Sequence, residues 1–128
     1  MRILLIEDDS DDIELLQEAL KNHAIAFEME VIKDGKMALD HIRIGKAAPE
    51  IVILDLNLPK VHGKELILEI KAQTIFKDIP LLVLTTSSAK EDIEYAYKYG
   101  AAKYLIKPTT MERIREMVET IVSLSKNQ

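Results

Sequence analysis

The stretch Ile51-Val52-Ile53-Leu54-Asp55-Leu56-Asn57-Leu58-Pro59 begins with four large aliphatic residues and turns polar at an aspartate. An unbroken aliphatic run of this length predicts a short strand covered on both faces, the usual state of strands in a parallel sheet. Further runs predict four more strands, of which the alternating run 28–32 is typical of a sheet edge: 3–6, 28–32, 81–85 and 102–106.

Amphipathic segments follow each predicted strand. Ser10 is expected to cap the first helix and Gly45 to end the second, while Ser88-Ala89-Lys90-Glu91 and Thr109-Thr110-Met111-Glu112 match the capping box that opens a helix. Strand and helix thus alternate five times. This order predicts an α/β fold, a doubly wound three-layer sandwich in which helices cover both faces of a parallel five-stranded sheet.

Composition narrows the class of protein. With 128 residues the chain has the length of one domain, and we expect a single domain over residues 1–128 without an output domain. The absence of cysteine excludes disulfides and thiolate sites. The net charge of −5 argues against nucleic acid as a partner. Apolar runs are far shorter than the roughly 20 residues that span a bilayer, and no signal-peptide pattern opens the chain, so we expect a cytoplasmic protein without a membrane partner.

Polar side chains follow four of the five predicted strands: Glu7-Asp8-Asp9, Asp55, Thr85-Thr86-Ser87 and Lys107. Each alone has an ordinary explanation as a turn, cap or solvated residue. In parallel α/β sheets, however, the carboxyl ends of the strands lie at one edge, where ligands bind. Carboxylates gathered there repel one another unless a cation or proton offsets them, and a set of oxygen ligands suits Mg²⁺. A carboxylate can also attack phosphorus, which favours Asp55 as nucleophile with Lys107 as counter-charge.

At this point the chain resembles the receiver domain of two-component response regulators, over essentially its whole length. The resemblance rests on motifs in matching order and spacing: residues 3–9, Asp55 to Pro59 with Gly63, Ile79-Pro80 before Thr85, Gly100-Ala101, and Lys107-Pro108. It implies a flavodoxin-like (βα)5 fold with strand order 2-1-3-4-5, as in the chemotaxis regulator.

The resemblance also implies residue roles. Asp55 would accept a phosphoryl group from a phosphohistidine on a sensor histidine kinase. Asp8 and Asp55 would bind Mg²⁺ (or Mn²⁺) directly, together with the backbone carbonyl of Asn57, and Glu7 would act through a bound water. After transfer, Thr85 and Lys107 would each contact a phosphoryl oxygen.

A conformational switch is implied as well. Tyr104 is expected to move inward as Thr85 moves toward the phosphate, and Lys107-Pro108 is expected to be a cis peptide. The altered surface would be the fourth helix, the fifth strand and the fifth helix. The protein would therefore be a signalling domain and not an enzyme, apart from its own phosphorylation and autodephosphorylation.

Details such as Leu84-Thr85-Thr86-Ser87 and Leu56-Asn57-Leu58-Pro59 resemble single-domain regulators of phytochrome-type histidine kinases. The implied partners are a phytochrome-like kinase, a downstream protein target or phosphotransfer domain, and a second copy bound through the switching surface. Tyr95, Tyr97 and Tyr99 fit such an interface. Alternatively, Tyr97 is core and the other two tyrosines are half-exposed packing.

Two positions depart from the pattern. His62 stands where an Asp before Gly63 is common, and we expect it to be a solvated loop residue. Thr86 is larger than the small residue often found after the switch threonine, and we expect it to narrow the access of water and to slow hydrolysis of the acyl phosphate.

Three other classes of protein agree less well with the residues at the predicted strand ends. A phosphatase of the haloacid dehalogenase type needs a second Asp as general acid at position 57, where an Asn cannot transfer the proton. A flavodoxin-like redox module would place Glu7-Asp8-Asp9 against a flavin phosphate. A degenerate receiver acting only as a scaffold would not need the intact acids, Thr85 and Lys107.

Overall fold

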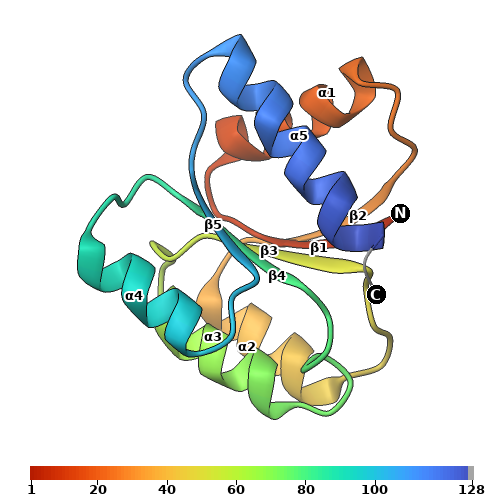
Figure 1. The fold of residues 1–128 in the computed structure, drawn as a ribbon. Coiled ribbons are helices and arrows are strands. Elements are labelled where there is room, and N and C mark those ends of the chain that lie inside the picture. The colour runs from red at the N-terminus through yellow and green to blue at the C-terminus, as the bar shows by residue number, and fades with distance from the viewer. Residues whose placement is uncertain (127–128) are drawn as a thin grey trace.

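Strand and helix alternate five times along residues 1–126, which are the residues that the computed structural model describes (Figure 1). In chain order the elements are β1 (Arg2–Ile6), α1 (Ser10–Asn22), β2 (Glu28–Ile32), α2 (Gly35–Ile44), β3 (Ile51–Leu54), α3 (Gly63–Ala72), β4 (Leu81–Thr85), α4 (Lys90–Lys98), β5 (Lys103–Ile106) and α5 (Met111–Lys126).

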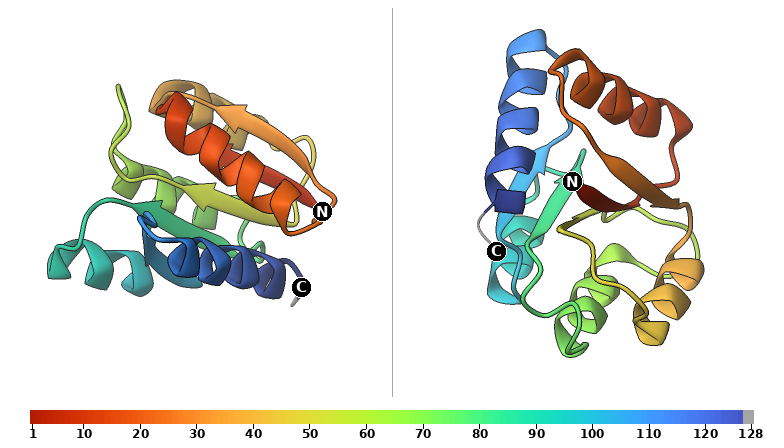
Figure 2. Two further views of the ribbon diagram at one scale, coloured as in Figure 1. Left: turned by 90° about the horizontal axis from the view of Figure 1, so that it is seen from above. Right: turned by 90° about the vertical axis from the view of Figure 1, so that its right-hand side faces the viewer.

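The strands form one parallel sheet in the order β2-β1-β3-β4-β5, which confirms the predicted α/β topology. Helices α1 and α5 cover one face, and α2, α3 and α4 cover the other (Figures 1 and 2). The register pairs Ile6 with Leu54 and Leu54 with Val83. The carboxyl ends of β1, β3 and β4 therefore lie side by side.

Two apolar layers account for the unbroken aliphatic runs. Alternate residues of β3 point to opposite faces of the sheet, so Val52 and Leu54 pack among α2, α3 and α4 while Ile51 and Ile53 pack against α1 and α5. All four are fully buried. In β2 the first four residues alternate between exposed and partly buried, as expected for an edge strand, and Ile32 at its end is buried.

The helix ends agree in part with the predicted caps. Gly45 ends α2 with a left-handed φ of 58°, a conformation that glycine adopts without steric cost. At α1, Asp9 and not Ser10 accepts the backbone N–H groups of Asp11 and Asp12. Asp34 likewise caps α2, because its side chain accepts the Met37 N–H. A carboxylate at these positions satisfies free N–H groups and complements the helix dipole.

The predicted capping box at Ser88 is wrong. Helix α4 begins at Lys90, and Ala89 occupies the position before it. The serine that organises this turn is Ser87, whose Oγ accepts the Ala89 N–H and donates to Asp92 Oδ2 at 2.5 Å. The prediction failed because the helix begins one residue later than the Ser88 pattern implies, which leaves Ser88 outside the cap position. At α5 the hydroxyl of Thr110, one residue later than expected, accepts the Arg113 N–H.

A close approach of backbones fixes the loop after β3. A Cβ on Gly63 would lie 2.4 Å from Leu56 Cα and 2.7 Å from the Asp55 carbonyl oxygen, so only glycine fits at the start of α3. The Gly63 N–H also donates to the Leu56 carbonyl. Gly63 thereby holds the chain around Asp55 in one position.

The expected cis peptide between Lys107 and Pro108 is not present, because this bond is trans. Trans is favoured by about 0.5–1 kcal/mol for a residue before proline, and nothing in the two residues themselves selects cis. Within the described residues 1–126, no helix combines the length and the apolar run needed to cross a bilayer.

Candidate functional site

The carboxyl ends of β1 and β3 bring three acids together. Glu7 and Asp8 follow β1, and Asp55 follows β3, where its N–H donates to the Ile6 carbonyl at 3.0 Å. The three side chains offer ligand oxygens that lie within 4.8 Å of one another. Glu7 and Asp55 are 3% and 4% exposed, whereas Asp8 is exposed. The predicted acidic cluster thus exists, and its exposed side faces solvent.

Lys107 reaches this cluster from the end of β5. Its Nζ lies 2.7 Å from Glu7 Oε1 and 3.0 Å from Asp55 Oδ2. A third carboxylate, Asp12 Oδ2, is 2.6 Å away. The backbone N–H of Lys107 donates to the Thr85 carbonyl, which ties the lysine to the end of β4. The ammonium group therefore neutralises part of the charge that the strand ends gather.

Burial and hydrogen bonding have opposite effects on the pKa values of Glu7 and of Lys107. Burial raises the pKa of Glu7 from 4.5 to about 7, against the lowering effect of its hydrogen bond from Lys107. Burial alone would lower the pKa of Lys107, but hydrogen bonds to Asp12, Glu7 and Asp55 raise it above its usual value. Lys107 is therefore a permanent cation at this site, while Glu7 holds its negative charge weakly.

The Thr85 hydroxyl is buried and, within residues 1–126, has no hydrogen-bond partner. An unpaired buried hydroxyl costs about 1–3 kcal/mol, so such a group is expected to have a use. Thr85 ends β4, next to the strand that carries Asp55. The position suits a hydrogen bond to a group that binds beside Asp55.

An open pocket lies above Asp55. Asp8, Asn57, Thr86 and Lys107 line it together with Asp55, and the Asn57 N–H donates to Asp55 Oδ1 at 3.2 Å. All the ligand atoms that the side chains of the acidic cluster offer to a metal ion are carboxylate oxygens. This donor set fits a hard divalent cation such as Mg²⁺ or Mn²⁺, which offsets clustered carboxylates.

Tyr104 on β5 occupies an inward position. The residue is 8% exposed and its hydroxyl donates to the Ser87 carbonyl at 2.8 Å. Its backbone N–H donates to the hydroxyl of Tyr97 on α4. Tyr97 is 45% exposed, so the interpretation of Tyr97 as core is wrong; it is Tyr95 that packs against the core. Tyr97 and Tyr99 are exposed on α4.

Two residues have roles that the sequence analysis did not predict. His62 is an exposed residue before α3, as expected, and it also caps this helix, because its Nδ1 accepts the Lys64 N–H at 3.1 Å. Asp12 was not among the predicted site residues, since acids in a first helical turn usually serve the helix dipole. Its place in the first turn of α1, shortly after the acidic end of β1, was the available signal.

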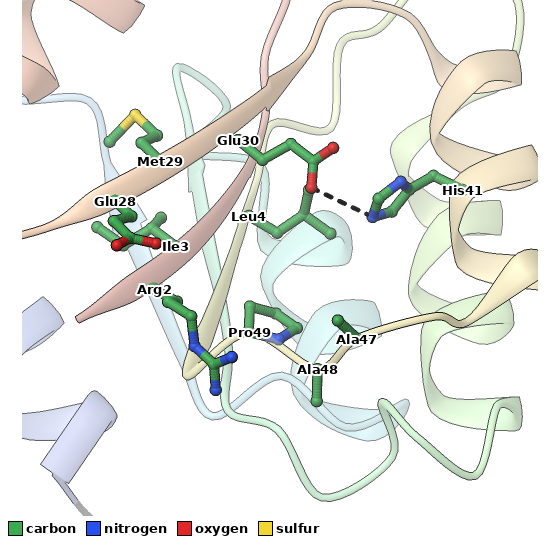
Figure 3. Close-up of a pocket in the computed structure, with 10 residues that line it drawn as sticks. All are labelled: Arg2, Ile3, Leu4, Glu28, Met29, Glu30, His41, Ala47, Ala48 and Pro49. Atoms are coloured by element: carbon green, nitrogen blue, oxygen red, sulfur yellow. Dashed lines mark ion pairs between the residues drawn. The ribbon is translucent and has the colours of Figure 1, made fainter.

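A second pocket lies at the other end of the sheet, beside the amino ends of β1 and β2 (Figure 3). Arg2, Glu30 and His41 are among its polar lining residues, and His41 Nε2 lies 3.7 Å from Glu30 Oε1. Because Lys107, Asp55 and Thr85 all lie beyond the opposite ends of the strands, this pocket is separate from the acidic site.

The fold and the site define a class of protein: a parallel α/β domain with an acidic, lysine-containing pocket at the carboxyl ends of its strands. The family model described as the response regulator receiver domain matches residues 3–119. The chain belongs to this family. It is the receiver domain of a two-component response regulator, and as such a signalling domain.

Named relatives support this assignment. The probable methanogenesis regulatory protein FilR2 of Methanothrix harundinacea is 39% identical over 123 residues, which are 93% of this chain and 79% of the relative. Response regulator Rcp1 of Synechocystis sp. is 36% identical over 126 residues, 94% of this chain and 86% of the relative.

Solved structures agree in fold. A Mn²⁺-bound form of response regulator Rcp1 has a TM-score of 0.83 at 36% identity, covering 95% of this chain and 91% of that one. The phosphorylated cyanobacterial phytochrome response regulator RcpA has a TM-score of 0.86 at 34% identity, and the match covers 98% of this chain and 94% of that one. The resemblance to regulators of phytochrome systems is confirmed at this level.

The raised pKa of Glu7 predicts a pH-dependent stability in the absence of divalent cations. Between pH 4.5 and 7 the folded protein holds a proton on Glu7 that the unfolded chain releases, so the free energy of unfolding should fall as pH rises through this window. The total loss should be about 1–3 kcal/mol. Urea denaturation followed by circular dichroism in EDTA, at pH values from 5 to 8, measures it.

Glu7→Gln should flatten this pH dependence, because the amide does not titrate. The control Glu14→Gln changes an exposed acid on α1 and should retain the slope of the wild-type protein. Equal slopes in Glu7→Gln and wild type would show that Glu7 titrates as an ordinary exposed carboxylate.

Proposed function

We propose that Asp55 is the phosphoryl acceptor and that the donor is a phosphohistidine on a sensor histidine kinase. The nearly buried carboxylate of Asp55 beside the ammonium of Lys107, 3.0 Å away, is the observation that carries the proposal. Phosphoryl transfer needs mainly positioning and charge neutralisation, and this pair supplies both.

The proposed transfer is a nucleophilic displacement at phosphorus. A carboxylate oxygen of Asp55 forms the new O–P bond while the P–N bond of the donor breaks, and the imidazole nitrogen keeps the electron pair and takes up a proton. Lys107 donates to a phosphoryl oxygen, and the free hydroxyl of Thr85 donates to another. Asp55 reaches the incoming group from the floor of the open pocket.

Asp8, Asp55 and the backbone carbonyl of Asn57 are proposed to hold Mg²⁺ or Mn²⁺ directly, and Glu7 through a water. The exposure of Asp8 and the burial of Glu7 support this division. When bound, the cation supplies positive charge to the phosphoryl oxygens. The Mn²⁺-bound form of Rcp1 and the phosphorylated form of RcpA support both parts of the proposal by analogy.

The output is proposed to be a protein contact on α4, β5 and α5 that depends on phosphorylation. The surface carries exposed large hydrophobic side chains, those of Tyr97, Tyr99 and Ile106. Such apolar groups can pack against a downstream protein, a phosphotransfer domain or a second copy of the chain. Thr85 and Tyr104 are the proposed switch residues. The likeness to RcpA supports a phytochrome-like kinase as donor. Apart from its own phosphorylation and dephosphorylation, the domain turns over no substrate.

Incubation with acetyl phosphate and Mg²⁺ should add one phosphoryl group to Asp55. Intact-mass and peptide mass spectrometry measure the addition and its site. Asp55→Asn and chelation of Mg²⁺ with EDTA should each abolish it, because they remove the nucleophile or the cation. Asp40→Asn, an exposed acid on α2, is the control and should be phosphorylated normally. Phosphorylation that persists in Asp55→Asn would refute the assignment.

Thr86→Ala should shorten the lifetime of the acyl phosphate. Thr86 lines the pocket above Asp55, so a smaller side chain opens a path for the attacking water. The decay of phosphorylated protein after removal of acetyl phosphate measures the lifetime. Ser88→Ala, an exposed change in the same loop, controls for altered loop mobility. An unchanged lifetime in Thr86→Ala would end this explanation.

A further inference from the structure

Lys107 has a partner that the proposed reaction does not use. The carboxylate of Asp12, in the first turn of α1, lies 2.6 Å from Lys107 Nζ, the shortest of the three contacts of this ammonium group. A primary ammonium carries three N–H donors. Glu7, Asp12 and Asp55 accept one each, so every donor of Lys107 is occupied in this structure.

A phosphoryl oxygen that binds Lys107 must therefore replace one of these carboxylates. Until the O–P bond forms, Asp55 and Glu7 both have nearly buried side chains, 5% and 4% exposed. Loss of Lys107 would leave either carboxyl group buried and unpaired, which is costly. Asp12 has a side chain 36% exposed, so water can replace the lost hydrogen bond.

Release of Lys107 by Asp12 does not require the backbone of α1 to move. Its backbone N–H is fixed by Asp9, which caps α1, so release needs only a rotation of the side chain. A carboxylate in a first helical turn is stabilised by the free N–H groups and the dipole of the helix. This attraction to the amino end of α1 remains when the Asp12–Lys107 contact breaks.

We infer that Asp12 is a positioning residue that acts through Lys107: its carboxylate holds the third N–H of the ammonium group in the unphosphorylated protein and yields it to a phosphoryl oxygen during transfer. The inference rests on the proposed function of Asp55. Asp12 then lowers the rate of phosphorylation, because the Asp12–Lys107 contact must break before Lys107 can neutralise the incoming group.

The test compares Asp12→Asn with Asp11→Asn in the acetyl phosphate reaction at saturating Mg²⁺. Both acids line the same pocket, and each change removes one negative charge from it, but the contact with Lys107 belongs to Asp12. The initial rate of phosphorylation of Asp55 is followed by intact-mass spectrometry. Measurements at about 0.5 M salt suppress general repulsion between the pocket and the anionic donor, since such charges are screened beyond a few ångströms.

Asp12→Asn should react about threefold to fivefold faster than Asp11→Asn, the gain expected when a partly exposed ion pair no longer has to break. Asp12→Glu, which keeps a carboxylate within reach of Lys107, should return the rate to within about twofold of wild type. A purely structural role for Asp12 would not produce a rate increase that the longer carboxylate reverses.

Equal rates for Asp12→Asn and Asp11→Asn, or a rate for Asp12→Asn below that of wild type, would overturn the inference while leaving the function of Asp55 intact. Absence of phosphorylation on Asp55 in the wild-type protein is a distinct result. It would contradict the proposed function, and the role of Asp12 with it.

Discussion

Four carboxylates and one ammonium group meet at the carboxyl end of the sheet, and the rest of the structure depends on the balance of their charges: Glu7, Asp8, Asp12 and Asp55, with Lys107. The parallel register forces Glu7 and Asp55 together, because β1 and β3 are neighbours and both end at this edge. Without Lys107 the two nearly buried carboxylates would face each other without compensation, an arrangement that is strongly unfavourable. Lys107 makes the acidic site compatible with folding, and in the proposed function it would also donate to a phosphoryl oxygen.

Contacts lead from this site to the surface on α4. The hydroxyl of Tyr104 bonds the carbonyl of Ser87, and the hydroxyl of Ser87 bonds Asp92. Asp92 in turn pairs with Lys64 of α3 at 2.7 Å. A change at Thr85, two residues before Ser87, would disturb this chain of contacts directly. Phosphorylation shifts a population only through differential contacts. Under the proposed function, the Thr85 hydroxyl, which has no partner within residues 1–126, would supply such a contact.

The sequence predicted the fold closely because burial on both faces leaves a plain pattern: runs such as Ile51 to Leu54 correspond to whole strands. It also indicated which strand ends would meet, and so brought Glu7, Asp8, Asp55 and Lys107 together; their chemical roles remain predictions. Finer features depended on geometry that no pattern encodes. Asp9 replaced Ser10 as a cap because either side chain can accept the N–H groups, and Asp12 joined the site through the direction of α1.

Anomalous diffraction from crystals grown with Mn²⁺ tests the central claim most directly, namely that the strand ends build a cation-binding pocket around the acceptor aspartate. A peak in contact with the carboxylates of Asp8 and Asp55 and the carbonyl of Asn57, at the roughly 2.0–2.2 Å typical of small divalent cations bound by oxygen, is the predicted result. A peak held elsewhere, such as by Glu28 and Glu30 on β2, with none beside Asp55, would contradict the account.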